Sequence, residues 1–240
     1  MDISNVTALI TGANRGIGRA LVAELHAAGA KRIYATARSL TDAEGLRTPD
    51  ERVKGVVLDV NDKGQIAGAA ARLGDVNLLI NNAGVLDFGN FLTASREQID
   101  RNFATNFFGP LEMTKAFAPV ITANGGGVVV NMLTLVALAS MPGLSVYNAS
   151  KAAAWSMTQS LRATLAPMQI KVMGVFPGAV DTDMIADIDM PKTAPAAIAK
   201  AIVAGLVAGT EDVFPDAMSA SVYDSWKADH KAVERQFATM

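Results

Sequence analysis

Short runs of β-branched and other apolar residues alternate along the chain with Ala-rich stretches in which apolar positions recur at helical spacing. The runs predict six strands, at Val6–Ile10, Arg32–Thr36, Val53–Leu58, Val76–Asn81, Val128–Met132 and Ile170–Phe176. The intervening stretches predict helices at Gly16–Ala28, Asp62–Leu73, Arg96–Ile121 (with Pro119 bending its last turn) and Ser145–Leu165. Continuous apolar strands that alternate with helices indicate a parallel sheet covered on both faces.

The fold class that follows is α/β, a Rossmann-type doubly wound parallel sheet, because right-handed crossovers place helices on both faces. The chain of 240 residues is half apolar and shows no linker or internal repeat, so we expect a single domain over 1–240. Pro195–Val207 is expected to be a packed Ala-rich helix. Ala217–Phe237 is expected to be one helix with Trp226 on its apolar side.

Charge and composition narrow the function. A net charge of −2 gives no reason to expect a nucleic-acid partner. Cysteine is absent and the only histidines are His26 and His230, so disulfides are excluded and no metal centre is expected. The N-terminus shows no export signal and no apolar stretch is long enough to span a bilayer, so we expect a cytoplasmic protein without a membrane partner.

The first predicted strand runs into a glycine-rich loop, Thr11–Gly18. Ligands of open parallel sheets bind beyond the carboxyl ends of the strands. Gly12 permits a tight turn, Gly16 lets the backbone approach a pyrophosphate, and Gly18 lets the helix pack closely on the sheet. An ordinary strand–helix turn needs only one or two glycines, so this loop indicates dinucleotide binding.

The end of the second predicted strand bears on the choice of nicotinamide cofactor. NAD-binding sites place a carboxylate there for the ribose 2′-hydroxyl. Here the strand is followed by Arg38, and no acidic residue occurs before Asp42. Arg38 and Arg15 of the glycine loop suit a 2′-phosphate, which favours NADP(H); the alternative is that both are solvated surface arginines.

Tyr147 and Lys151 are four residues apart, which places them on one face of the predicted helix Ser145–Leu165. A tyrosine with a pKa of about 10 is a poor acid–base catalyst at neutral pH. A nearby ammonium group, and an oxidised nicotinamide, are expected to lower that pKa. Such a pair arises by chance in many helices, but beside a dinucleotide loop it indicates acid–base catalysis of hydride transfer.

These residues resemble the short-chain dehydrogenase/reductase family over about residues 5–182. Five motifs stand in the family's order, namely Thr11–Gly18, Asp59-Val60, Asn81-Asn82-Ala83-Gly84, Tyr147–Lys151 and Pro177–Thr182. The resemblance implies that the cofactor contacts come from Gly12, Asn14, Arg15, Gly16, Ile17, Gly18, Arg38, Asp59, Val60, Asn82, Ala83, Gly84, Tyr147, Lys151, Pro177, Gly178, Val180 and Thr182.

The resemblance also implies a catalytic set of Asn106, Thr134, Tyr147 and Lys151. Asn106 would hold a water in a proton relay; the alternative is a polar residue that bends its helix. The family has a serine where this chain has Thr134, 13 residues before Tyr147. The threonine hydroxyl can still polarise a carbonyl, whereas its methyl group can crowd the pocket and its χ1 is stiff, so an active enzyme and a less efficient site are both open.

The implied reaction is reversible hydride transfer from the pro-S face of NADPH to a ketone or aldehyde. Tyr147 gives the proton, Thr134 polarises the carbonyl, and Lys151 binds the nicotinamide ribose and lowers the pKa of Tyr147. Three competing functions share the cofactor motifs: a catalytically weak NADP-binding sensor or scaffold, an enzyme that acts mainly as an alcohol dehydrogenase, and an epimerase or dehydratase that recycles its cofactor.

Apolar residues near the predicted site form a candidate substrate pocket, although each could equally be plain core: Leu135, Val136, Met141, Leu144, Met184 and Ile185. The candidate substrate loop is short, at about 182–195, and the C-terminal segment covers 210–240. Val213–Met240 does not resemble the Gly-Gly-rich closing strand of many tetrameric family members. A homo-oligomer is still expected, either a tetramer or a dimer through the helices that contain Asn106 and Tyr147, with a monomer as the remaining alternative.

Overall fold

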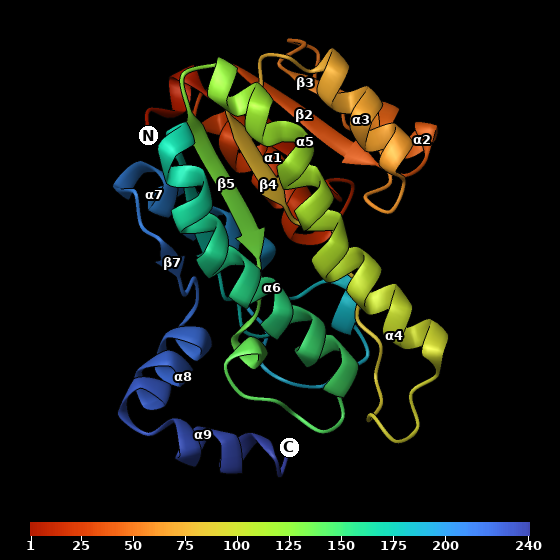
Figure 1. Cartoon of the computed structure of the whole chain (residues 1–240), viewed down its shortest axis with the longest axis vertical. Coiled ribbons are helices and arrows are strands. Elements are labelled where there is room, and N and C mark those ends of the chain that lie inside the picture. The colour runs from red at the N-terminus through yellow and green to blue at the C-terminus, as the bar shows by residue number, and fades with distance from the viewer.

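The structure, a computed structural model that describes residues 1–240, contains one sheet of seven parallel strands in the order β3-β2-β1-β4-β5-β6-β7 (Figure 1). The strands are β1 Thr7–Ile10, β2 Arg32–Ala37, β3 Val53–Val57, β4 Leu78–Asn81, β5 Gly127–Met132, β6 Ile170–Val175 and β7 Asp212–Val213. The crossover direction reverses between β1 and β4, which confirms the predicted doubly wound α/β fold. The carboxyl ends of these two strands therefore border the crevice in which such sheets bind ligands.

Nine α-helices accompany the sheet: α1 Gly16–Ala27, α2 Leu40–Glu44, α3 Lys63–Arg72, α4 Arg96–Phe103, α5 Gly109–Ala123, α6 Ser145–Leu165, α7 Pro195–Ala208, α8 Ala217–Ala228 and α9 His230–Phe237. Helices α1 and α7 pack together against one face, and α3, α5 and α6 lie against the other (Figure 1). The sheet therefore has a separate apolar core on each face. Ile10 of β1 belongs to the core under α1, and its neighbour Leu9 belongs to the core under α5. No helix combines the length and apolar character needed to cross a bilayer.

The helix predicted over Arg96–Ile121 is interrupted. It consists of α4, a π-helical segment Ala104–Phe108 and α5, and it continues through Pro119 to Ala123. Pro110 follows the π-helical segment and has no N–H to donate to the carbonyl four residues before it, which favours wider turns at this point. The widened segment includes Asn106, so the irregularity coincides with a predicted site residue.

The C-terminal region also differs from its prediction. The helix expected over Ala217–Phe237 is two helices, because Asp229 leaves the helical conformation and accepts the Ala232 N–H as the cap of α9. The short strand β7 and the small helix α2 were not predicted from the sequence. Figure 1 shows α8 and α9 beyond the carboxyl ends of the strands, at the edge of the sheet where α6 begins.

Aromatic side chains fix α8 to the body of the domain. Phe214 stacks on Phe176 at 4.9 Å and on Tyr223 of α8 at 3.9 Å, measured between ring centroids. Trp226 of α8 meets Trp155 of α6 edge-to-face at 5.9 Å. Such aromatic pairs stabilise the fold by more than the burial of their apolar area alone. Helix α8 is therefore firmly attached to α6 and to the segment that follows β6.

Candidate active site

The glycine loop is tied to the turn after β4 by a set of short hydrogen bonds. The Thr11 hydroxyl accepts the N–H groups of Asn82 (2.9 Å) and Ala83 (3.0 Å). The Asn82 side chain donates in return to the carbonyl oxygens of Thr11 (2.9 Å) and Gly12 (3.0 Å). Two loops at the crevice between β1 and β4 are therefore held in one arrangement.

The three glycines of the loop leave a cradle that other residues would fill. Gly12 and Gly16 have positive φ angles, of 62° and 52°, which residues with a side chain rarely adopt. A Cβ on Gly16 would lie 3.1 Å from Thr182 Cγ2, and one on Gly18 would lie 2.6 Å from Asn82 Nδ2 and closer still to the Gly12 carbonyl oxygen. An open backbone at the N-terminus of α1 fits the pyrophosphate of a dinucleotide.

The two arginines expected at a 2′-phosphate have different surroundings. Arg38 follows β2 directly, is exposed and makes no ion pair. Arg15 is also exposed, but its guanidinium pairs with Asp183 at 3.0 Å. An exposed pair of this kind contributes little free energy and is readily exchanged for a phosphate.

The remaining predicted cofactor residues lie at the same edge of the sheet. Asp59 and Val60 follow β3, where the Asp59 N–H donates to Gln65 Oε1 at 2.9 Å and Val60 faces Gly109 at the start of α5. The turn after β6 is held at Gly178, whose N–H donates to Asp216 Oδ2 at 2.9 Å. Val180 pairs with Thr193, which closes the base of the candidate substrate loop. Asn14 is half-buried, and Ile17 packs on the core beneath α1.

Asn106 is surrounded by partners in the π-helical segment. Its side chain accepts the Val85 N–H (3.0 Å) and donates to the Val85 carbonyl oxygen (2.9 Å) and to Ser150 Oγ (2.9 Å). Ser150 donates in turn to the carbonyl oxygen of Tyr147 at 2.7 Å. A Cβ on Gly84 would lie 3.3 Å from Asn106 Oδ1 and 3.7 Å from Lys151 Nζ, so the turn after β4 passes close to both side chains.

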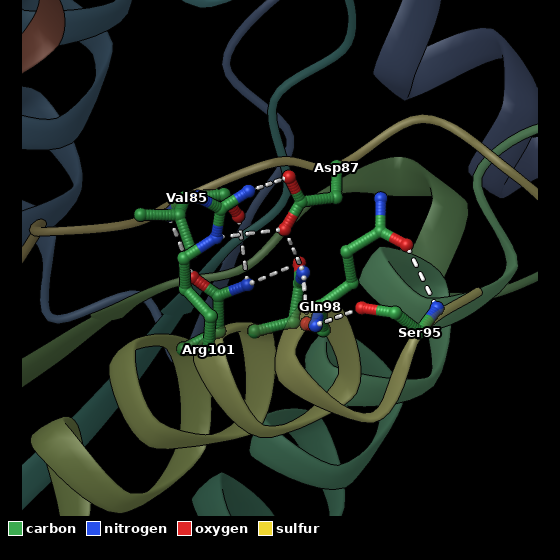
Figure 2. A network of polar contacts seen from close by, with 7 residues as sticks. Val85, Asp87, Ser95, Gln98 and Arg101 are labelled. Carbon is green, nitrogen blue, oxygen red and sulfur yellow. Dashed lines mark hydrogen bonds and ion pairs between the residues drawn. The ribbon is translucent and has the colours of Figure 1, made fainter.

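A second polar network supports this arrangement from α4 (Figure 2). Asp87 forms an ion pair with Arg101 and accepts a 2.7 Å hydrogen bond from Asn102 Nδ2. Asn102 is fully buried and lies one turn before Asn106, whose Nδ2 is 3.5 Å from Asn102 Oδ1. Ser95 and Gln98 form a capping box at the start of the same helix. The network fixes the segment after β4 to the helix that presents Asn106.

Thr134 and Tyr147 present adjoining hydroxyl groups. Tyr147 is only 8% exposed, and this burial raises the pKa of its phenol to about 12, while a hydrogen bond from the Thr134 hydroxyl opposes the rise. The expected lowering of the Tyr147 pKa by Lys151 is therefore wrong for the chain by itself. The physical reason is that desolvation disfavours the phenolate and no ammonium group contacts its oxygen.

Lys151 points to the sheet. Its Nζ donates to the Met132 carbonyl oxygen at 2.7 Å and lies 5.8 Å from the centre of the Tyr147 ring. Burial lowers the pKa of this ammonium group to about 8. Its proton is accordingly held less firmly than that of an ordinary lysine.

The residues of the predicted substrate pocket have different surroundings. Leu135 and Val136 share one buried apolar cluster with Tyr147, and Met141 packs against that cluster. Leu144 precedes α6 and is half-buried, outside the cluster. Met184 is 40% exposed and also lies outside the cluster, as does its neighbour Ile185. The apolar surroundings of Tyr147 are completed instead by residues of α8 and α9.

The family model described as short chain dehydrogenase matches residues 6–192. The chain is a short-chain dehydrogenase. It is 34% identical over 185 residues to "Carbonyl reductase [NADPH] 2" of Sus scrofa, with 77% of this chain and 75% of that protein covered. It is also 34% identical over 230 residues to "Galactitol 2-dehydrogenase" of Agrobacterium fabrum, with 89% of each covered.

A solved structure agrees with the chain over almost its whole length. The short chain dehydrogenase from Burkholderia cenocepacia J2315, determined in complex with NADP, superposes with a TM-score of 0.92 at 36% identity and covers 99% of each chain. The family model ends at 192, so helices α7, α8 and α9 of this short-chain dehydrogenase lie outside the matched region.

Some residues of this short-chain dehydrogenase's site were not predicted from the sequence. Ser150 lies within the Tyr147–Lys151 motif and has no spacing signal of its own. Asp87 is a single acidic residue among apolar neighbours, and Asn102 lies in a polar stretch that resembles any solvated helix. Val233 and Phe237 are four residues apart in an otherwise polar helix, which is an amphipathic pattern that sequence reasoning could have used.

Proposed function

We propose that this short-chain dehydrogenase reduces a ketone or aldehyde to an alcohol with NADPH as its hydride donor. The observation that carries the proposal is the pair of adjoining hydroxyl groups of Tyr147 and Thr134, buried beside Lys151 at the edge where the glycine loop lies. The NADP bound to the Burkholderia cenocepacia structure supports the choice of cofactor, as does the exposed, unpaired Arg38 after β2.

The residues present fit the cofactor, because the glycine cradle, the clamped turn Asn82–Gly84 and the Pro177–Thr182 turn leave open backbone on one edge. When bound, NADPH supplies the hydride. Tyr147 Oη donates its proton to the carbonyl oxygen as negative charge develops there, and the Thr134 hydroxyl donates a hydrogen bond that stabilises the same charge. Lys151, with its lowered pKa, holds a labile proton near the Tyr147 ring, and Asn106 holds the surrounding segments in place.

The protonation state of Tyr147 favours reduction over oxidation. With a pKa raised to about 12 by burial, the phenol keeps its proton at neutral pH and is ready to act as an acid. Alcohol oxidation needs the phenolate, which this site disfavours in the absence of added positive charge. The dehydrogenase named among the relatives keeps oxidation open as the second direction of the same reaction.

The test is the change in NADPH absorbance with a panel of ketones and aldehydes, with NADH and with NADP plus alcohols run in parallel. We expect stoichiometric loss of NADPH on some carbonyl compounds. NADPH binding without turnover on any panel member would support the non-catalytic sensor instead, and product formation without net NADPH loss would indicate an epimerase or dehydratase.

Arg38→Asp tests the assignment of the 2′-phosphate. Replacing a cation by a carboxylate should lower the ratio of kcat/KM for NADPH to that for NADH by about 10- to 100-fold, because hydrogen bonds to charged groups contribute about 1.5–3 kcal/mol. Lys171→Asp, the same charge change near the opposite end of the sheet, is the control and should leave the ratio unaltered. An unchanged ratio in Arg38→Asp would move the phosphate site to other residues.

A further inference from the structure

Helix α9 buries two of its side chains against the rest of the molecule. Of the residues from His230 to Met240, only Val233 and Phe237 are buried, and their spacing of four places them on one face. Both belong to the apolar cluster that contains Tyr147, Leu135 and Val136. The buried face of α9 thus packs in the same apolar cluster as Tyr147 and as two residues of the predicted substrate wall.

No polar contact reinforces this attachment. The side chains of α9 form ion pairs only within the C-terminal segment, Lys231 with Glu234 and Arg235 with Asp229. Helix α8, in contrast, is anchored by its aromatic contacts and by Asp216, whose carboxylate caps α8 and accepts the Gly178 N–H. The face of α8 that includes Met218, Val222 and Trp226 packs on the same cluster. Helix α8 is therefore firmly attached to the domain, whereas α9 is held by apolar contacts alone.

We propose that Val233 and Phe237 form the outer wall of the substrate pocket and set the size of the apolar group that a carbonyl substrate can carry. The inference rests on the proposed reductase function and extends it to the substrate class, carbonyl compounds with a small apolar substituent. Phe237 is the larger of the two side chains and is only 4% exposed, so its replacement by alanine would leave the largest space in the cluster. These residues lie beyond the part of the chain that the family model matches.

The first experiment compares 2-butanone, 2-hexanone and 2-octanone as substrates for the full-length protein and its variants. Phe237→Ala should raise the ratio of kcat/KM for 2-octanone to that for 2-butanone by about 10-fold or more, because each added methylene is discriminated by the space available to it. Phe237→Trp should lower the same ratio. Gln236→Ala, on the exposed face of α9, is the matched control and should match the wild type.

If the ratio of kcat/KM for 2-octanone to that for 2-butanone shifts in opposite directions in the two Phe237 variants, destabilisation is not the cause. Destabilisation would lower kcat/KM for every ketone alike and leave the ratio unchanged. Equal ratios in Phe237→Ala, Phe237→Trp and wild type would overturn the proposal. Failure of the wild type to reduce any ketone or aldehyde would instead overturn the reductase function, and the second experiment then decides whether α9 covers Tyr147.

The second experiment measures nitration of Tyr147 by tetranitromethane, read by peptide mass spectrometry without substrate or cofactor. Val233→Ala and Phe237→Ala should accelerate nitration of Tyr147. Nitration of Tyr34, which is buried on β2, should stay slow and so report that the domain is folded. If Tyr147 is nitrated at the wild-type rate in both variants, α9 does not cover the tyrosine and the proposal fails.

Discussion

Tyr147→Phe is expected to lower kcat by about 10³-fold, within the range of about 10²–10⁴ that a positioned acid contributes. The substitution removes the phenolic proton and keeps the ring that fills the apolar cluster with Leu135 and Val136. NADPH affinity and thermal stability should therefore stay close to the wild type. Steady-state kinetics, NADPH titration and a melting curve together measure the three quantities.

Tyr34→Phe is the matched control for the loss of a tyrosine hydroxyl. Tyr34 lies on β2, donates to Asp75 at 2.9 Å and accepts from Arg32, so its hydroxyl has no partner in the glycine loop. Its kcat should be that of the wild type. Substantial turnover by Tyr147→Phe would mean that another group delivers the proton.

Gly18→Ala is expected to weaken NADPH binding by about 10-fold or more, equivalent to at least about 1.4 kcal/mol. The added methyl group would overlap the Gly12 carbonyl oxygen and lie 2.6 Å from Asn82 Nδ2, so the clamp between the glycine loop and the turn after β4 must open. Overpacking of this kind costs about 1–3 kcal/mol of folding free energy. Isothermal titration with NADPH and thermal unfolding measure the two losses.

Gly68→Ala provides the comparison, because a Cβ at Gly68 meets nothing within 4 Å in the interior of α3. Alanine has the higher helix propensity, so this variant should be more stable by up to about 1 kcal/mol and bind NADPH normally. Equal NADPH affinity in Gly18→Ala and Gly68→Ala would show that the loop tolerates a side chain and that the cradle does not hold the phosphates.

The alternation of apolar strands and helices was enough to predict the parallel sheet and its direction of winding, because each pattern repeats over many residues. The glycine loop and the Tyr147–Lys151 pair could also be predicted, because each motif is defined by residues that are only a few positions apart in the sequence. The break at Asn106 was missed although Pro110 was visible, because Asn106 is also held by Val85 and Ser150, which are far from it in sequence. The division of the C-terminal helix at Asp229 had a local signal, the preference of aspartate for caps.

Properties that depend on burial could not be predicted from spacing. The sequence places Lys151 on the helix face of Tyr147, and a lowered tyrosine pKa follows from that neighbourhood alone. In the structure the desolvation of Tyr147 raises its pKa, and Lys151 does not offset this rise because it is directed to the Met132 carbonyl oxygen. The same limit applies to the residues around Tyr147, because two side chains from the other end of the chain, Val233 and Phe237, belong to its apolar cluster.

The contact between Trp155 and Trp226 has a spectroscopic consequence. The chain contains only these two tryptophans, and they meet at the junction of α6 and α8. Tryptophan emission of the protein therefore arises from one place, where the C-terminal helices join the domain. The intrinsic fluorescence of the unmodified protein is in effect a local reporter of how those helices are seated, and no label has to be introduced to follow them.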